Sequence, residues 1–305
     1  MKSLFLVVLL TLSACSSVTK DDSSRPSAII SGVRVASLNY RIEGGKTLND
    51  IFNHLEPFVA EAVKNKAKYI LIPELIVLDL FSVNPEEEEV RKELDKTALL
   101  AQDYLSRLTN IAAKYDVSII GASYIVKKGN HFINRAVYIR PGEAPLFQDK
   151  VHPTPWEIRY GFKGSGGIQE FSSKDFNFAI LICHDAEFPG VSTSLIFKRP
   201  EVLFVPSQTD DVLGFNRVLY TSSARAIEHM AYVVMTGTSS LKDAPWHTYE
   251  GRNVFLRPQN KYFPQGYEKS SLEEELSYYD LDLSKLRESR RDLKQVYPAR
   301  DFKRL

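Results

Sequence analysis

The sequence contains very little cysteine, since Cys15 and Cys183 are the only two in 305 residues. It also has almost no net charge, because 39 lysines and arginines stand against 38 aspartates and glutamates. Proteins that bind nucleic acid concentrate positive charge on one face, so this balance predicts no nucleic-acid partner. No internal repeat, low-complexity tract or second linker divides the rest of the sequence, which predicts one globular domain.

Long apolar runs are also scarce, and the clearest one lies at the N-terminus. Residues 1–14 read MKSLFLVVLLTLSA, with one lysine, an apolar stretch over 4–12 and small residues ahead of Cys15. This layout predicts a signal peptide, because the apolar stretch is too short for a permanent membrane-spanning helix. The segment LSAC resembles the lipobox of bacterial lipoproteins, which implies cleavage before Cys15 and a lipid on that cysteine. The alternative is an ordinary signal peptide that ends near a cysteine.

The residues after Cys15 predict a tether followed by the folded domain. The segment 15–28 is short, polar and free of apolar periodicity, so it is expected to be a flexible tether. The folded domain is expected over 29–305. The lipoprotein resemblance implies a lipid anchor in the bacterial cell envelope. Ser16 stands where an aspartate often signals retention in the inner membrane, which favours the outer membrane with the domain facing the periplasm.

Short apolar runs alternate with amphipathic segments along the predicted domain. Strands are predicted over 33–38, 69–73, 117–126, 131–139, 176–183, 202–207 and 231–237, and helices over 47–66, 97–114, 191–198 and 215–230. This alternation predicts an α/β fold with a parallel or mixed sheet. Asn49 or Asp50 is the expected cap of its helix, and Leu100 is expected to face the core. The charge run over 84–96 is expected to be a solvated loop that enters a helix.

Three chemically complementary side chains follow buried strands. Glu74 comes after YILIP, Lys150 after PLFQD, and Cys183 after FNFAILI. Strand ends are common positions for binding sites in α/β proteins, because the sheet holds the backbone while the loops leave room for a ligand. A lysine ammonium favours a thiolate and stabilises an oxyanion, and a carboxylate can accept the thiol proton. With Cys15 lipidated, Cys183 has no disulfide partner and is either an inert buried thiol or a nucleophile.

These segments resemble the motifs of the nitrilase, or carbon-nitrogen hydrolase, superfamily, whose members use a Glu-Lys-Cys triad in this order. YILIPEL resembles the first motif and implies that Glu74 is the general base. CHDAEFP resembles the third motif, Cys-x-Asp-x-x-Phe-Pro, and implies that Cys183 is the nucleophile. The second motif, DKVHPTPWEIRYGFKG, resembles the nitrilase branch at Lys150, Pro153, Thr154, Glu157, Tyr160 and Gly161.

The resemblance implies a four-layer αββα sandwich, a homodimer or higher homo-oligomer, no cofactor and a small amide-like substrate. It implies that Lys150 and the backbone N–H of His184 hold the oxyanion, and that Glu157 orients the lysine. His184, Glu187 and Tyr160 are expected to line the substrate pocket. Family amidases often have arginine where this chain has Glu187. This chain is therefore not expected to share the substrate of those members.

Alternatives remain open at this point. A nitrilase would use the same triad on a nitrile, and a catalytically silent envelope lipoprotein could retain the fold as a binding module. Many true nitrilases carry Cys-Trp-Glu at the nucleophile, whereas this chain has Cys-His-Asp, and this difference favours an amidase over a nitrilase. His152, His184 and Asp185 suggest a metal site, but no two histidines have ligand spacing on one element, so no metal is expected.

Overall fold

The chain builds two β-sheets, one mainly from each half of the sequence, in a computed structural model that describes residues 32–83, 85–240, 249–270 and 273–302. The predicted signal peptide (1–14), the lipidated Cys15 and the tether (15–28) lie outside the described residues. No helix in the described part of the chain is long and apolar enough to cross a membrane.

The first sheet has the strand order β10-β1-β2-β3-β4-β5, and on the edge of β1 away from β2, β13 pairs with residues 33–39 while β10 pairs with residues 40–42. Its strands are β1 (Val33–Ile42), β2 (Tyr69–Ile72), β3 (Ser118–Lys128), β4 (His131–Ile139), β5 (Leu146–Asp149), β10 (Thr238–Ser240) and β13 (Glu275–Leu281). The central strands β1, β2 and β3 are parallel, with Val35 opposite Tyr69 and Tyr69 opposite Ser118. Every residue of β2 is buried, as expected for a parallel strand covered on both faces.

The second sheet has the order β12-β11-β9-β8-β7-β6. Its strands are β6 (Phe171–Ser172), β7 (Asn177–Ile180), β8 (Val202–Pro206), β9 (Tyr232–Thr236), β11 (Val254–Leu256) and β12 (Tyr267–Lys269). The inner strands β7, β8 and β9 are parallel, and Val202 lies opposite both Phe178 and Tyr232.

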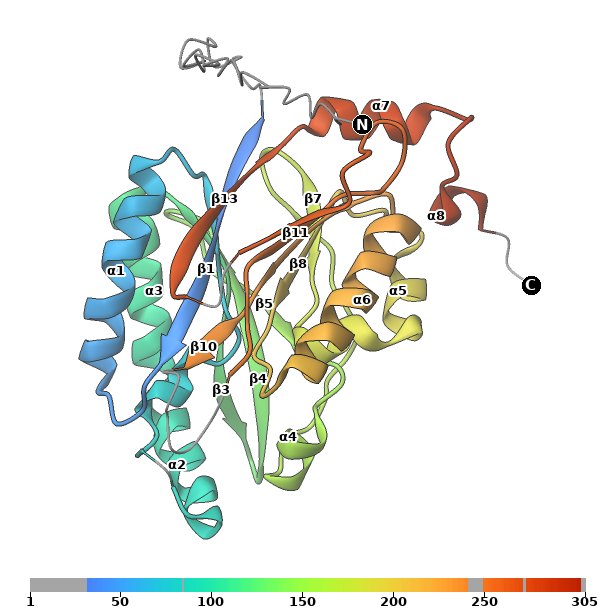
Figure 1. Ribbon diagram of the computed structural model, residues 1–305. Helices are drawn as coiled ribbons and strands as arrows, with labels where there is room; N and C mark the ends of the chain where they lie inside the picture. Colours follow the sequence, from blue (N-terminus) through green and yellow to red (C-terminus); the bar gives the residue numbers. More distant parts are fainter. Residues whose placement is uncertain (1–31, 84, 241–248, 271–272, 303–305) are drawn as a thin grey trace, which may run out of the picture. The chain divides into compact units, whose positions relative to one another are not determined.

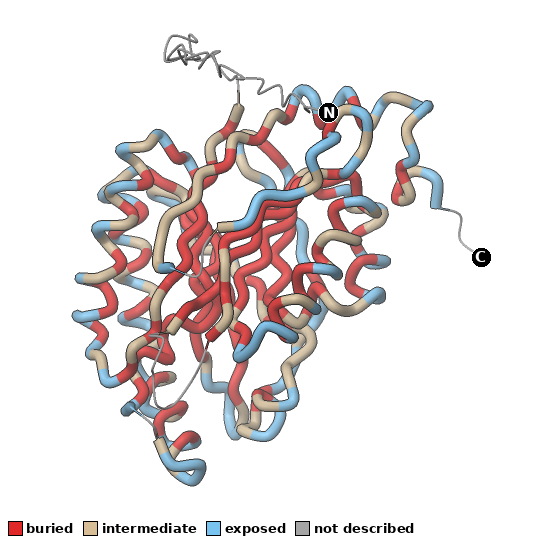
Figure 2. Tube along the Cα trace, in the orientation of Figure 1, coloured by how far each residue is buried: buried red, intermediate tan, exposed pale blue. Residues whose placement is uncertain are grey.

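The two sheets pack face to face, and helices cover their outer faces (Figure 1). Aromatic rings join the sheets, since Tyr138 of β4 meets Phe178 of β7 edge-on at 4.8 Å and Phe255 of β11 stacks on Tyr279 of β13 at 4.8 Å. The helices α1 (Leu48–Lys64) and α3 (Ala101–Tyr115) cover the first sheet, and α5 (Pro189–Leu195) and α6 (Val212–Glu228) cover the second. Burial is concentrated on the sheets and the inward sides of the helices (Figure 2). The predicted αββα sandwich is therefore confirmed.

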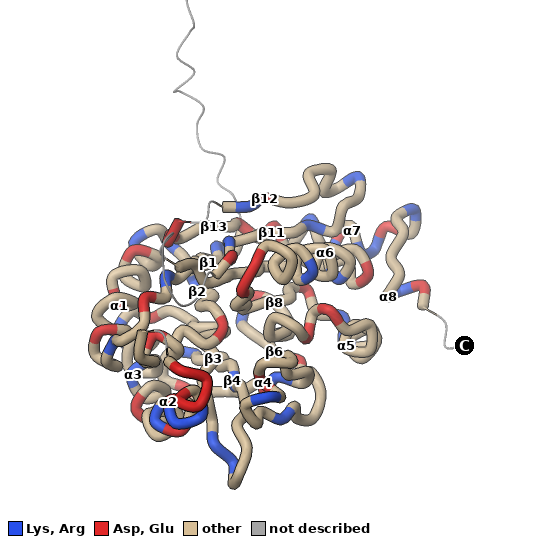
Figure 3. Tube along the Cα trace, turned by 60° about the horizontal axis from the view of Figure 1, so that its bottom comes forward, with Lys and Arg blue, Asp and Glu red and all other residues tan. Residues whose placement is uncertain are grey.

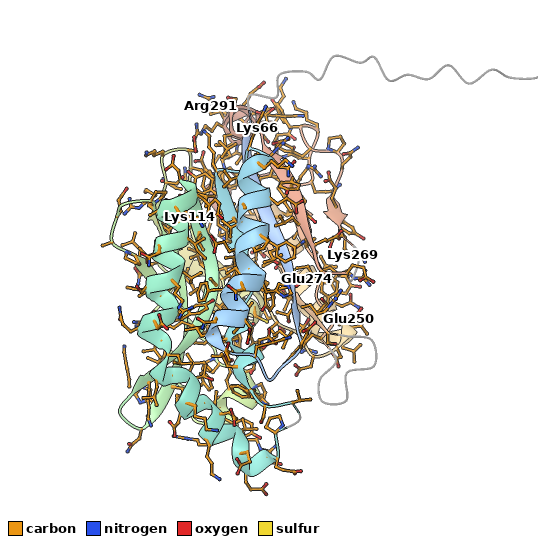
Figure 4. All side chains as sticks on the ribbon, turned by 90° about the vertical axis from the view of Figure 1, so that its left-hand side faces the viewer. Lys66, Lys114, Glu250, Lys269, Glu274 and Arg291 are labelled. Atoms are coloured by element: carbon orange, nitrogen blue, oxygen red, sulfur yellow. The ribbon has the colours of Figure 1, made fainter. Side chains whose placement is uncertain are left out.

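The helices of the first sheet are linked by polar contacts at their outer surface. Figure 4 shows α1 and α3 side by side, with Lys114 on α3. The Lys114 ammonium lies 2.6 Å from the Glu56 carboxylate of α1, and the His54 ring of α1 lies 2.9 Å from Glu274 ahead of β13. These contacts join segments that are far apart in the sequence.

Two predictions about local structure were wrong. The helix after β1 is capped by Thr47 instead of Asn49 or Asp50, because Thr47 is extended and its hydroxyl accepts from the Asp50 N–H at 3.2 Å. The Asp50 carboxylate in turn accepts the Thr47 N–H at 2.8 Å, which completes a capping box. Leu100 does not face the core but lies exposed between two helices.

The charge run over 84–96 enters a helix, as predicted, but the loop part is short and most of the run is helical. Helix α2 (Glu87–Leu99) begins inside the run and buries Val90 and Leu94. Acidic residues gather at its N-terminal turn, where Figure 3 shows a cluster of negative charge. Carboxylates there are favourable, because the N-terminal end of a helix carries partial positive charge.

Candidate functional site

The three predicted site residues come together where strands of both sheets end. Glu74 follows β2 and Lys150 follows β5 of the first sheet, while Cys183 follows β7 of the second. All three side chains are almost fully buried. The strand β2 and most of β7 are buried, whereas β5 is a partly exposed edge strand and not the buried strand predicted before Lys150, and the paired sheets hold the backbone at all three positions.

The Lys150 ammonium lies between two carboxylates. Its Nζ is 2.7 Å from Glu74 Oε1 and 2.8 Å from Glu157 Oε2, and the lysine side chain is 2% exposed. Burial by itself lowers the pKa of Lys150, but the charges of Glu157 and Glu74 outweigh it and raise that pKa well above its usual value. Lys150 is therefore a permanently charged cation inside the protein.

Glu74 has partners on both carboxylate oxygens. Oε1 accepts from Lys150 and from Asn134 Nδ2 at 2.8 Å, and Oε2 accepts the backbone N–H of Gln208 at 2.9 Å. Burial raises the pKa of Glu74, and the nearby Glu157 charge adds to this, although Lys150 opposes it. Glu74 therefore takes up a proton more readily than an exposed glutamate.

Glu157 is placed by a short helix, α4 (Pro155–Arg159), through a capping box with Thr154. Its Oε2 accepts the Thr154 N–H at 2.7 Å and its Oε1 accepts from Asn134 Nδ2 at 2.9 Å. Burial raises the pKa of Glu157, but Lys150 outweighs burial and the net pKa is lowered. The two glutamates around one lysine thus differ, because Glu157 is held ionised and Glu74 binds protons more easily.

Cys183 opens the 3₁₀ helix η2 (Cys183–Glu187) in a strained backbone conformation. Its φ of 49° lies in the left-handed region that non-glycine residues rarely adopt. The thiol Sγ lies 3.6 Å from the carbonyl oxygen of Gln208. Burial, and next the Glu74 charge, raise the pKa of the thiol well above its usual value, and Lys150 opposes them. The thiol therefore keeps its proton unless a base removes it.

Asp185 ties the segment after Lys150 to the turn that carries Cys183. Its Oδ1 accepts the backbone N–H of Val151 at 3.1 Å and that of His152 at 2.7 Å. The His152 ring stacks on Phe188 at 3.7 Å, which adds a second connection. These contacts give both polar residues partners within the protein, and the described residues contain no group of three or more His, Cys, Asp or Glu side chains that could hold a metal ion.

A cavity of about 590 Å³ opens above the buried cluster. The predicted pocket residues Tyr160, His184 and Glu187 all line it, together with Cys183 and Lys150. A volume of this size suits a small molecule.

The family model of the carbon-nitrogen hydrolases matches residues 34–291. The chain belongs to the carbon-nitrogen hydrolase family. Among similar proteins, the probable hydrolase YhcX of Bacillus subtilis is 30% identical over 207 residues, covering 68% of this chain but only 40% of that protein's length. A deaminated glutathione amidase of Synechocystis is 23% identical over 239 residues, which is 74% of this chain and 85% of that protein.

Solved structures of carbon-nitrogen hydrolases share the fold. One from Helicobacter pylori aligns with a TM-score of 0.74 at 18% identity, covering 88% of this chain and 94% of that chain. An amidase of the nitrilase superfamily from Nesterenkonia aligns with a TM-score of 0.69 at 18% identity, covering 87% and 96%. Both support the αββα sandwich.

Two residues of the site escaped the sequence analysis. Asn134 on β4 donates to both glutamates, and a buried asparagine within an apolar strand is a signal that could have indicated it. Gln208 contributes its backbone N–H and carbonyl oxygen, so its side chain carried no signal at all.

Proposed function

We propose that the protein is an amidase-type carbon-nitrogen hydrolase that acts through a thioester on Cys183. The observation that carries this proposal is the convergence of Cys183, Lys150, Glu74 and Glu157 at the floor of one cavity. A nucleophile, a base and a fixed cation are the groups that acyl transfer requires.

In the first half of the reaction, the Glu74 carboxylate takes the thiol proton and the Cys183 sulfur attacks the amide carbon. The carbonyl electron pair moves to oxygen, and the charged Lys150 stabilises that oxyanion, with the backbone N–H of His184 as the second proposed donor. The carbon-nitrogen bond then breaks, the protonated Glu74 gives its proton to the departing ammonia or amine, and a thioester remains.

In the second half, water attacks the thioester while Glu74 accepts a water proton. The tetrahedral intermediate releases the carboxylic acid, the sulfur leaves as a thiolate, and Glu74 returns the proton to it. Burial raises the pKa of the thiol and also that of Glu74, so the base is matched to a thiol that does not ionise by itself. Glu157 keeps Lys150 charged and oriented throughout.

Known relatives support this chemistry without determining the substrate. One solved structure of the Nesterenkonia amidase shows covalent addition of the acetamide moiety of fluoroacetamide at its active site cysteine. Another shows that enzyme in complex with butyramide. The similar protein from Francisella tularensis, 28% identical over 160 residues, is a citrullinase.

The test is turnover on matched panels of amides, carbamoyl compounds and nitriles. The wild type is expected to release ammonia or an amine from amides, and Cys183→Ala is expected to abolish this. In Cys183→Ala the side chains of Glu74 and Lys150 remain, so a loss of turnover would identify the thiol as the group that the reaction requires. Turnover of nitriles alone would support a nitrilase, and no Cys183-dependent turnover on any panel would support a silent binding module.

We also propose that a lipid on Cys15 anchors the mature chain in the bacterial cell envelope, with the outer membrane favoured, and that the chain forms a homodimer or larger homo-oligomer. These proposals rest on the LSAC segment and on the resemblance to the family.

A further inference from the structure

The mouth of the cavity carries an excess of negative charge. Outside the buried Glu74, Lys150 and Glu157 cluster, the described lining residues with full charges are Glu87, Glu187, Asp210, Asp211 and Arg217. Four carboxylates therefore line the cavity beside one guanidinium, and one of the four, Glu87, is also paired with Arg159. A cleft lined by one sign of charge attracts ligands of the opposite sign, because its low-dielectric walls focus the field.

Of these four carboxylates, Glu187 is the nearest to the nucleophile along the chain, since both belong to the turn η2. Its side chain is only 16% exposed, and Oε1 lies 3.2 Å from His184 Nδ1. Its cationic partner is Arg217 of α6, whose Nε lies 3.3 Å from Oε2 and whose side chain is 63% exposed. An ion pair to so exposed a side chain is weak, because solvent screens it and the long side chain loses entropy in forming it. A ligand cation can therefore replace Arg217.

Part of the cavity lining is apolar. It is formed by Leu75, Leu78 and Phe81 around the 3₁₀ helix η1 (Ile76–Leu80), with Val90 of α2 and Trp156 of α4. This part suits a methylene chain or another apolar body. The cavity lining thus combines apolar side chains, the Cys183 thiol and the four carboxylates of Glu87, Glu187, Asp210 and Asp211.

We propose that the substrate is a small amphipathic amide that carries a cationic ammonium or guanidinium group, which binds against Glu187 in place of Arg217. This inference rests on the proposed amidase function, because it assigns a substrate class to that same site. An anionic amide is disfavoured, since its charge would meet the four carboxylates of the mouth.

The test compares three straight-chain amides of equal length that end in an amino, a methyl or a carboxylate group. The wild type is expected to show kcat/KM highest for the amino amide, about tenfold above the methyl amide, which is the effect of one partly screened charge pair. Glu187→Gln keeps the side-chain shape and is expected to remove that preference, while Glu187→Asp retains it. Arg217→Gln is expected to increase the preference, because it removes the competing cation.

Asp103→Asn is the matched control, because it removes one exposed carboxylate of α3, where Asp103 pairs with Arg107 outside the cavity. The preference should be unchanged in this variant and should weaken with rising salt in the wild type. Turnover of the three amides at equal rates, or a preference that Glu187→Gln leaves intact, would overturn the inference but leave the amidase function standing.

Calorimetric binding to Cys183→Ala separates the two proposals when no turnover occurs. Tighter binding of the amino amide, lost on adding Glu187→Gln, would support the cationic ligand even if catalysis failed. Equal binding of the three probes, or binding of none, would overturn it.

Discussion

Asn134 is the residue whose loss should distinguish positioning from simple packing. Its Nδ2 donates to Glu74 at 2.8 Å and to Glu157 at 2.9 Å, so it holds both carboxylates around Lys150. Asn134→Leu keeps the branched shape of the side chain but removes both donors, and kcat is expected to fall by about 10- to 100-fold, as for two charge-assisted hydrogen bonds. Measurement of kcat on the best amide from the panel checks this.

A pH profile makes the same prediction sharper. The N–H donors of Asn134 favour the ionised carboxylate, so their removal should raise the pKa of Glu74 and move the acid limb of kcat/KM to higher pH. Asn177→Leu, on the exposed start of β7, is the control and should leave both the rate and the profile unchanged. A slower enzyme with an unmoved acid limb would indicate that Asn134 acts only through packing.

His229 should make the free energy of unfolding depend on pH. It is fully buried, its Nε2 lies 2.8 Å from Ser192 Oγ, and burial lowers the pKa of His229 from 6.5 to about 4. The unfolded chain therefore binds a proton on His229 more readily than the folded chain does. The stability that the neutral His229 contributes to the folded state is complete above pH 6.5 and is lost as the pH falls towards about 4. The loss is expected to be about 3 kcal/mol, at 1.36 kcal/mol for each pKa unit.

Urea denaturation at pH 7 and at pH 5 measures about 2 kcal/mol of this loss, because at pH 5 the folded-state pKa of about 4 has not yet been reached. His229→Gln is expected to flatten the difference between the two pH values, even if it lowers stability at pH 7. His131→Gln, at the start of β4, is the matched control and should retain the wild-type difference. An unchanged pH dependence in His229→Gln would assign acid sensitivity to other groups.

At the scale of elements, the start of α1 offers a direct test of its cap. Thr47→Ala removes the hydroxyl that accepts the Asp50 N–H and is expected to lower the free energy of unfolding by about 1 kcal/mol. Asn49→Ala is the control, because Asn49 only accepts a hydrogen bond from the exposed Arg107 guanidinium. A larger loss in Asn49→Ala than in Thr47→Ala would contradict the observed cap.

The helices after β2 show where a sequence pattern stops being sufficient. The periodicity of Tyr104, Leu108 and Ile111 predicted the inward face of α3, and the structure buries all three. The same pattern extended the helix back to residue 97, whereas α2 ends at Leu99 and Leu100 is both the C-cap of α2 and the N-cap of α3. A break between two consecutive helices depends on how each packs on the sheet, which periodicity does not record.

At the scale of the whole molecule, the N-terminus makes a separate prediction. Labelled palmitate should enter the wild type expressed in a bacterial host, because the LSAC segment resembles a lipobox. Cys15→Ala should abolish the label and release the protein from the membrane fraction. Cys183→Ala is the matched control and should remain labelled, since Cys183 lies in the buried site. Label that persists in Cys15→Ala would refute the lipid anchor.

The sequence by itself determined which residues could do chemistry and which segments form the strands that carry them. Glu74, Lys150 and Cys183 are each identified by local context, namely a polar residue at the end of an apolar run. The spacing of apolar residues and the lengths of the apolar runs are local properties as well, so the α/β class could be predicted before any contact was known.

Only the tertiary structure decided how these residues meet and what surrounds them. Asn134 reaches Glu74 across 60 positions and the Gln208 N–H reaches Glu74 across 134, because the packing of two sheets brings distant strand ends together. The pairing of Glu187 with the exposed Arg217 is equally invisible in the sequence, since α6 lies thirty positions later. Strand order and sheet packing determine these contacts, and a linear pattern of apolar and polar residues specifies neither.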